Sequence, residues 1–167
     1  MSNREGDDLG RGASRDTSGE GDWPDLAGRL VAKGHVLPLR VYYEDTDFSG
    51  LVYHANYLKW IERGRSDYLR LLGVHHNVLL AGDGEKEASV FVVRRMELDY
   101  LKPARIDEVL EVRTTCGELG AAWLYLDQTV LRGDTLLFKA RVQVVLISQS
   151  GKPMRLDDHI RTAFGGN

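Results

Sequence analysis

The stretch "YYEDTDFSGLVYHANY", Tyr42–Tyr57, joins two segments of different hydrophobic periodicity. Before it, residues Val36–Tyr43 alternate between apolar and other side chains, which predicts a β-strand, and Pro38 favours an edge strand or a strand start. After it, apolar side chains recur at the spacing of an α-helix. The predicted buried face of that helix consists of Tyr57, Leu58, Ile61, Arg65, Tyr68, Leu69 and Leu72.

Two glycines bear on the predicted helix, one at its end and one inside it. Gly73 stands where a helix commonly ends with a glycine in the left-handed conformation. Gly64 lies inside the helix, where glycine lowers helix propensity. We expect a sheet to approach the helix closely at Gly64.

The acids of the quoted stretch also resemble part of a calcium-binding loop. Counting Asp45 as position 1 puts acids at 1 and 3, Ser49 at 5 and Gly50 at 6. Position 12 should then be glutamate, but it is Asn56, and a strand rather than a helix precedes the loop. Both departures disfavour calcium, and no metal site is predicted.

A strand–turn–helix junction is the better interpretation of this stretch. Gly50 allows the chain to turn, and the helix is expected to start near His54–Asn56 with Asn56 as its N-cap. The free N–H groups of the first helical turn can stabilise an oxyanion, and an upstream carboxylate can act on the same carbonyl group. The alternative is that Asp45 and Asp47 only form Asx turns and that His54 is an ordinary histidine at a helix start.

The remaining sequence predicts strands and turns. Alternating patterns mark four strands in sequence joined by tight turns, in the segments "SVFVVRRMELDYL", "EVLEVRTTC", "AAWLYLDQTVL" and "LLFKARVQVVLI". The "RGD" at Arg132–Asp134 is expected to be a hairpin turn, and "LDDHIRTAF" a short closing helix. His75 and His76 are expected to be loop residues. The predicted class is α+β, with an antiparallel sheet of about five strands on one face of a single long helix.

Composition limits the possible functions. Residues 1–24 hold six acids and three arginines, so the other 143 residues have 19 acids and 19 Lys or Arg and no net charge. This balance disfavours nucleic-acid binding, and no apolar run is long enough for membrane insertion. One cysteine, Cys116, fits a reducing compartment and is expected to be structural rather than nucleophilic. We therefore expect a cytoplasmic protein.

One folded domain, preceded by a tail of different character, is expected. Residues 1–30 form an acidic tail with little to bury, which predicts a disordered or loosely ordered segment, and 31–167 form the folded domain. Within the boundary region, "WPDLAGRLVAKG" (23–34) is expected to be a short helix.

The segment "RVYYEDTDFSGLVYHANYLKWIERGRSDYLR" closely resembles the first motif of hotdog-fold acyl-CoA thioesterases of the 4-hydroxybenzoyl-CoA thioesterase type. Within that family it is most similar to the group associated with the bacterial Tol–Pal envelope system. The segment "FVVRRMELDYLKPARIDEVLEV" resembles the second motif, and the likeness runs from about Leu39 to Ser148. The resemblance implies a curved antiparallel sheet wrapped around a central helix, and a homodimer or homotetramer with active sites at a subunit interface.

The resemblance also implies roles for individual residues. The second acid of the D-x-D pair, Asp47, would be the catalytic carboxylate, and the backbone N–H near His54 would polarise the thioester carbonyl. Tyr53 and His54 match the family's aromatic–histidine pair. The expected substrate-binding residues are Tyr43, Gly50, Tyr53, Asn56 and Arg94.

One departure concerns coenzyme A. Some relatives place basic residues in the turn after the third strand, but this chain reads "CGELGAAW" there. Arg94, Arg95, Lys102 and Arg105 are then candidates for the CoA phosphates, although Arg94 could equally be a core arginine paired with an acid.

The predicted function is hydrolysis of an acyl-CoA thioester, with acyl carrier protein as an alternative thioester carrier and with no cofactor. Asp47 would act as general base or as nucleophile, and His54 would orient the substrate or protonate the thiolate. The alternative is a non-hydrolytic hotdog module that binds acyl-CoA or acyl carrier protein.

Overall fold

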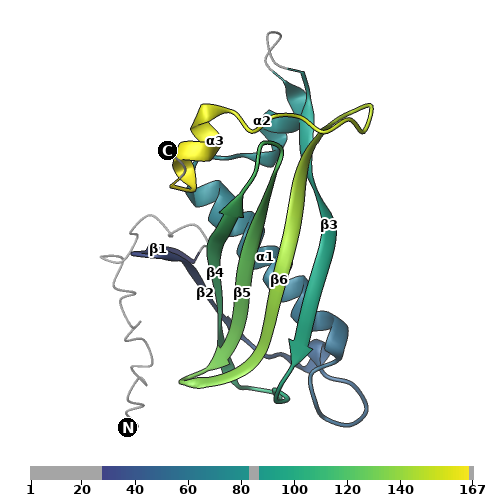
Figure 1. The fold of residues 1–167 in the computed structure, drawn as a ribbon. Coiled ribbons are helices and arrows are strands. Elements are labelled where there is room, and N and C mark those ends of the chain that lie inside the picture. Colours follow the sequence, from purple (N-terminus) through teal and green to yellow (C-terminus); the bar gives the residue numbers. More distant parts are fainter. Residues whose placement is uncertain (1–27, 83–86, 166–167) are drawn as a thin grey trace, which may run out of the picture.

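The computed structural model describes residues 28–82 and 87–165, which form one antiparallel sheet and one long helix (Figure 1). The strands are β1 (Arg29–Val31), β2 (Gly34–Arg40), β3 (Ser89–Tyr100), β4 (Val109–Leu119), β5 (Trp123–Arg132) and β6 (Thr135–Ser148). The helices are α1 (His54–Leu71), α2 (His76–Ala81), α3 (Asp158–Ala163) and the short 3₁₀ helix η1 (Tyr43–Asp45). The predicted α+β class is confirmed, with six strands in place of about five.

The strand order in the sheet is β1-β2-β4-β5-β6-β3, and every neighbouring pair is antiparallel. The "RGD" turn is confirmed as a two-residue hairpin turn between β5 and β6, with Gly133 at φ 55°. The prediction of four strands joined by tight turns is wrong for β3 and β4. Strand β3 pairs with β6, and residues 101–108 carry the chain back to β4 on the other side of β5 and β6.

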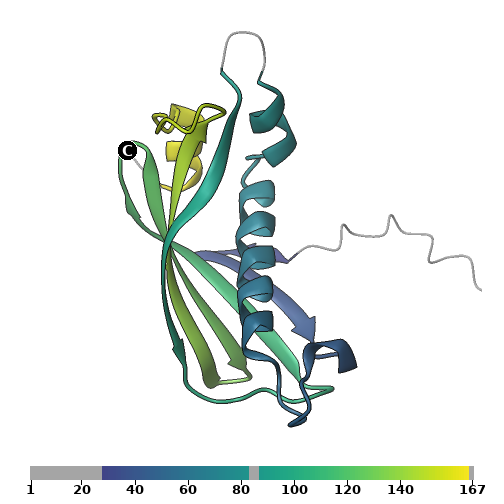
Figure 2. The same cartoon turned by 90° about the vertical axis from the view of Figure 1, so that its right-hand side faces the viewer.

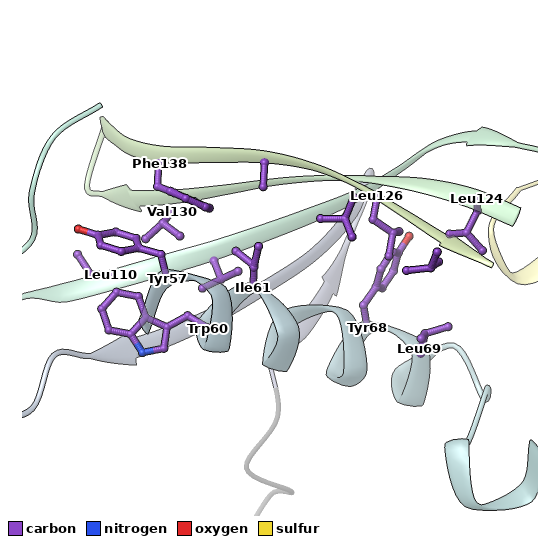
Figure 3. Packing of buried hydrophobic residues seen from close by; sticks show 14 of the residues in the cluster. Tyr57, Trp60, Ile61, Tyr68, Leu69, Leu110, Leu124, Leu126, Val130 and Phe138 are labelled. Carbon is purple, nitrogen blue, oxygen red and sulfur yellow. The ribbon is translucent and has the colours of Figure 1, made fainter. Parts of the chain in front are cut away.

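The sheet curves around one face of α1 (Figure 2). Tyr57, Ile61 and Tyr68 of α1 pack toward Phe138, Leu126 and Leu124 of the sheet (Figure 3). Five of the predicted face residues are buried, whereas Leu58 and Leu72 are only partly buried. Trp60 is 2% exposed and belongs to the core, although the periodicity did not select it.

Gly64 marks the closest approach of α1 to the sheet. A Cβ atom at this position would lie 2.9 Å from Val112 Cγ1 and 3.2 Å from Thr114 Oγ1, both on β4. The predicted reason for a glycine inside the helix is therefore confirmed: any larger side chain would push α1 away from β4.

The end of α1 agrees with the prediction, but the next segment does not. Gly73 has φ 78°, and the N–H of Val74 donates to Leu69 O at 2.9 Å, which closes the last turn. His76 starts the helix α2, so the prediction of a loop there is wrong. The predicted closing helix is confirmed as α3, which Asp157 caps by accepting from Ile160 N at 2.8 Å.

The region before the quoted stretch also differs from the prediction. Residues 29–31 of the predicted helix 23–34 form strand β1, which pairs with β2, and residues 23–27 lie outside the described part. The next strand runs over Gly34–Arg40 rather than Val36–Tyr43, because Tyr43 belongs to η1. The predicted boundary at residue 30 falls inside β1, and most of the predicted tail lies outside the described residues.

Simple alternation in β3 predicts one apolar face that holds Val90, Val92, Met96, Leu98 and Tyr100, with Arg94 among them, but a bulge breaks this face. The pairing with β6 shifts between Val93 and Arg95, so Arg94 is the extra residue. As a result Phe91 packs against the core before the bulge, and Met96 and Leu98 do so after it. Arg94 is exposed, and none of the described acids forms an ion pair with it, so it is not a core arginine. Within the described ranges no helix is long and apolar enough to cross a membrane.

Candidate active site

The candidate site lies where η1 leads into α1, at the end of the molecule opposite α2 and α3 (Figure 1). Asp45 organises this loop. Its backbone oxygen accepts hydrogen bonds from Tyr53 N at 2.9 Å and from Asn56 Nδ2 at 2.7 Å. Its Oδ2 accepts from Tyr42 N at 2.8 Å. The first acid of the D-x-D pair therefore holds the chain that enters α1.

Asp47, the second acid, sits in a tight turn and is exposed. Its Oδ1 accepts from Ser49 N at 2.8 Å and from Ser49 Oγ at 2.5 Å, which is an Asx turn. Gly50 completes the turn with φ 75° and donates its N–H to Asp47 O at 3.0 Å. Oδ1 of Asp47 thus forms the Asx turn of the alternative interpretation. Oδ2 accepts no hydrogen bond from the described residues and remains free for chemistry.

The electrostatics of the loop keep Asp47 ionised. The Ser49 hydroxyl and then the Ser49 amide hold the pKa of Asp47 below its ordinary value, and the charge of His54 acts in the same sense. The pair of donors on Oδ1 also fixes the orientation of the carboxylate. Asp47 therefore presents an oriented, negatively charged oxygen at neutral pH.

The N-terminus of α1 offers backbone donors beside this loop. The N-cap is Tyr53, without a side-chain hydrogen bond, and the helix begins at His54. Asn56 is not the predicted N-cap: it lies inside the first turn, and its buried amide holds Asp45 instead. The N–H groups of His54 and Ala55 donate to no described residue, and the first turn contains no acid. The positive end of an 18-residue helix is thus free to bind a negative oxygen.

Aromatic side chains anchor the helix start. The ring of His54 lies 4.4 Å from that of Tyr53 and 6.3 Å from that of Tyr100, centroid to centroid. The Tyr100 hydroxyl donates to His54 O at 3.1 Å. Tyr57 is buried and accepts from Ala104 N at 2.9 Å, and Val52 N donates to Ala104 O at 2.9 Å. These bonds clamp the loop and the helix start onto the connection between β3 and β4.

The predicted site residues divide into two groups. Those that the structure brings together at the junction are Asp47, Gly50, Tyr53, His54 and Asn56. Tyr43 lies one turn upstream in η1 and is 84% exposed. Arg94 lies six residues along β3 from Tyr100, about 20 Å at the rise of a strand, and does not join the junction within this chain.

Sequence reasoning missed three residues of the junction. Ser49 follows Asp47 at the spacing of an Asx turn, so that pattern could have identified it. Tyr57 was predicted only as a core residue, and Tyr100 only as a strand residue. Their hydroxyl partners, Ala104 and His54, are 47 and 46 residues distant in sequence. No local pattern indicates such pairs.

A separate cavity of about 410 Å³ lies at the other end of α1. Its lining includes Val74, Leu79, Leu146, Met154 and Ile160 from α2, β6 and the α3 region. The length of α1, about 27 Å at 1.5 Å per residue, separates it from Asp47. Within one chain this cavity is therefore not part of the junction.

Comparison with known proteins matches residues 49–139 to the thioesterase superfamily. The chain is 37% identical to the acyl-CoA thioesterase YbgC of Haemophilus influenzae over 81% of its own length and 97% of that protein. It is 39% identical to the acyl-CoA thioester hydrolase YbgC of Escherichia coli O6:H1, over 76% and 92% of the two chains. A crystal structure of a probable thioesterase from Bartonella henselae superimposes with a TM-score of 0.70 at 44% identity, covering 74% of this chain and 99% of that one.

These matches explain the strand order and the single helix. The sheet wrapped around α1 is the hotdog fold, as the resemblance implied. The family match includes β3, β4, β5 and α1, and begins inside the Asp47 turn. The chain belongs to the thioesterase superfamily.

Proposed function

We propose that this protein hydrolyses acyl-CoA thioesters to a carboxylic acid and free CoA. One observation carries the proposal. Asp47 is oriented and ionised, and it lies in the loop that leads directly into the start of α1. Among the described residues, its Oδ2 and the first N–H groups of α1 have no hydrogen-bond partner. A carboxylate and amide donors in one junction are what attack on a carbonyl carbon requires. The relatives named as acyl-CoA thioesterases support the choice of thioester.

In the proposed reaction, the carbonyl oxygen of the thioester binds the N–H groups of His54 and Ala55. Negative charge that develops on this oxygen is stabilised by the helix N-terminus. Asp47 either takes a proton from an attacking water or attacks the carbonyl carbon itself to form an anhydride that water then cleaves. In both routes a C–O bond forms, the C–S bond breaks, and the sulfur leaves as a thiolate that gains a proton.

The other residues position the reacting groups. His54 is exposed next to Asp47 and is assigned to orienting the substrate or protonating the thiolate. Gly50 and Asn56 keep the turn and the helix start in place through their hydrogen bonds to Asp47 O and Asp45 O. Tyr53 and Tyr43 expose aromatic rings for the substrate. No cofactor is needed for these steps, and we propose that they take place in the cytoplasm.

We infer further that the active unit is a homodimer, which can assemble into a tetramer. Apolar side chains lie exposed around the junction, including Phe48, which is fully exposed, and Tyr43, Leu101 and Ile106. Strand β3 has 12 residues, and no strand in the described part of the chain pairs with its outer edge. A second copy would cover this surface and would shield Asp47 from bulk solvent. Sedimentation velocity tests the inference, and a monomer at micromolar concentration would contradict it.

The test of the function is thiol release from short, long and aromatic acyl-CoAs and from acylated acyl carrier protein. Hydrolysis of at least one acyl-CoA supports the proposal. Binding without hydrolysis of any thioester would favour the non-hydrolytic module instead. Single-turnover reaction in ¹⁸O-labelled water detects an anhydride that water cleaves at the Asp47 carbonyl, because that route leaves the label in Asp47 and an unlabelled Asp47 oxygen in the first acid released. In the general-base route the label enters the acid itself.

A further inference from the structure

A second cluster of charge lies along α1, outside the junction. A surface hollow of about 460 Å³ is lined by Leu58, Lys59, Glu62, Arg63 and Arg65 of α1 and by Met96 of β3. Three of these residues are cations and one is an acid. The carboxylate of Glu62 already accepts from Ser66 Oγ at 2.7 Å. The hollow therefore has a surplus of positive charge and apolar edges.

Arg65 is the unusual member of this cluster because it is buried. It is only 8% exposed, and its one hydrogen bond in the described part of the chain runs from Nη1 to Gln128 Oε1 at 3.0 Å. Gln128 is neutral, and its own amide donates to Ile61 O and Thr114 Oγ1, both at 2.8 Å. No carboxylate among the described residues forms an ion pair with Arg65.

A buried guanidinium without a counter-ion is costly. Burial lowers the pKa of Arg65, with only the charge of Glu62 acting against it. Buried charges in proteins are usually paired, so the missing anion is expected to come from outside the chain. Guanidinium groups bind phosphate through paired hydrogen bonds, which makes phosphate a suitable anion for this position.

The position of the hollow relative to the junction fits one end of a CoA molecule. Lys59 lies five residues and Arg65 eleven residues beyond His54, about 8 and 16 Å along the helix. The extended pantetheine arm of CoA separates its thioester from its phosphates by a length comparable with the distance to Arg65, and Lys59 lies nearer to the thioester along the same helix. By contrast, Arg105 pairs through its backbone with Leu51, close to Asp47, where the thioester rather than a phosphate would lie.

We propose that the hollow formed by Lys59, Arg63 and Arg65 binds the phosphate groups of the CoA nucleotide. This inference rests on the proposed function, because it assumes that the thioester of the same molecule lies at Asp47. Three cations suit the pyrophosphate and 3′-phosphate of CoA better than the single phosphodiester of acyl carrier protein. The segment "CGELGAAW", which runs from the end of β4 into β5, carries no cation, so α1 replaces it as the source of positive charge.

The test compares CoA with pantetheine, which lacks the phosphates, by calorimetry at low salt. The Lys59→Gln/Arg63→Gln double variant removes two exposed cations without touching the core. We expect CoA to bind about tenfold or more weakly to it, with pantetheine binding unchanged and a shallower salt dependence for CoA. Lys152→Gln, an exposed cation after β6, is the matched control and should bind CoA like the wild type.

A second variant examines the buried charge. Arg65→Gln should also weaken CoA binding about tenfold, while the melting temperature of the free protein stays the same or rises, because an unpaired buried charge is removed. Unchanged CoA affinity in both variants overturns the proposal. A shift of either variant to a smaller species in sedimentation also overturns it, since the hollow would then be a contact between copies.

The result also separates this inference from the proposed function. If CoA binding depends on Lys59 and Arg63 but no thioester is hydrolysed, the result supports the phosphate-binding role of the hollow and contradicts the proposed hydrolysis. If hydrolysis is normal and the three substitutions leave the KM for acyl-CoA unchanged, the result supports the proposed hydrolysis and contradicts the phosphate-binding role of the hollow.

Discussion

The hydroxyl of Ser49 donates to Oδ1 of Asp47 at 2.5 Å, and this bond is the main reason why the pKa of Asp47 lies below its ordinary value. The carboxylate therefore stays ionised further into the acid range. In Ser49→Ala the pKa should rise toward its ordinary value, so the acid limb of the kcat/KM profile should move to higher pH. The rate at neutral pH should change little, because Asp47 is ionised there in both proteins.

A pH–rate profile between pH 3 and 8 measures this shift. Ser66→Ala, which removes a hydroxyl bonded to Glu62 outside the junction, is the control and should leave the limb in place. If the acid limb of the Ser49→Ala profile lies at the same pH as in the wild type, a group other than Asp47 controls the loss of activity in acid.

Asp47→Asn preserves the shape of the turn but removes the charge from Oδ2. We expect kcat/KM to fall by about 10²–10⁴ if the carboxylate is a general base, with folding unchanged. Glu44→Gln neutralises an exposed acid three residues upstream and should keep full activity. Thiol release measured on both variants decides the assignment, and full activity in Asp47→Asn would transfer the role to another group.

Asp45 is expected to act through structure and not through charge. Asp45→Asn can still accept the hydrogen bond from Tyr42 N, so activity should be largely retained. Asp45→Ala removes that acceptor and should loosen the loop, lowering both activity and resistance to proteolysis near η1. If Asp45→Asn is as inactive as Asp47→Asn, the two acids share the chemistry.

Tyr57→Phe tests the clamp between α1 and the β3–β4 connection. The substitution leaves the buried N–H of Ala104 without an acceptor, which should lower the free energy of unfolding by about 1–3 kcal/mol. Tyr68→Phe is the matched control, because the hydroxyl of this buried tyrosine has no hydrogen bond to a described residue. Urea unfolding of the two variants should differ clearly, and equal stabilities would contradict the clamp.

Gly64→Ala should destabilise the protein even though alanine is the better helix former. The gain in helix propensity is about 1 kcal/mol, but the added Cβ would press on Val112 Cγ1 at 2.9 Å. Overpacking of this kind costs about 1–3 kcal/mol, so the net loss should be up to about 2 kcal/mol. A melting temperature of Gly64→Ala at or above the wild-type value would contradict this expectation. It would mean that β4 can shift away from α1 without a cost in stability.

Cys116 offers a test of the expected structural thiol. Burial, with a contribution from Asp127, raises the pKa of Cys116 to about 11, so only about 0.1% is thiolate at pH 8. The native protein should react with iodoacetamide far more slowly than the unfolded protein, and Cys116→Ala should retain activity. Loss of activity without loss of stability would reopen a nucleophilic role.

Local patterns predicted the parts of the fold that depend on near neighbours in the chain. The alternation around Val144 and Leu126 predicted strands, and the spacing of Tyr57, Ile61 and Tyr68 predicted α1. Gly73 and Gly133 marked a helix end and a hairpin turn because only glycine adopts a positive φ easily. The same local chemistry selected Asp47 and Gly50 as the turn before the helix.

The structure alone decided which distant segments meet. Strand β3 crosses to pair with β6, and β1 replaces an expected helix because Arg29 pairs with Val36. Arg94 is exposed because a bulge changes the faces of β3, which alternation cannot reveal. Local patterns in the sequence were enough to predict the long helix, five of the six described strands and the acid-bearing turn, since each follows from contacts within a few residues. Three features depend on packing between segments far apart in the chain and follow only from the fold. These are the strand order, the hydrogen bond between Tyr57 and Ala104, and the burial of Arg65 without an ion pair to a described residue.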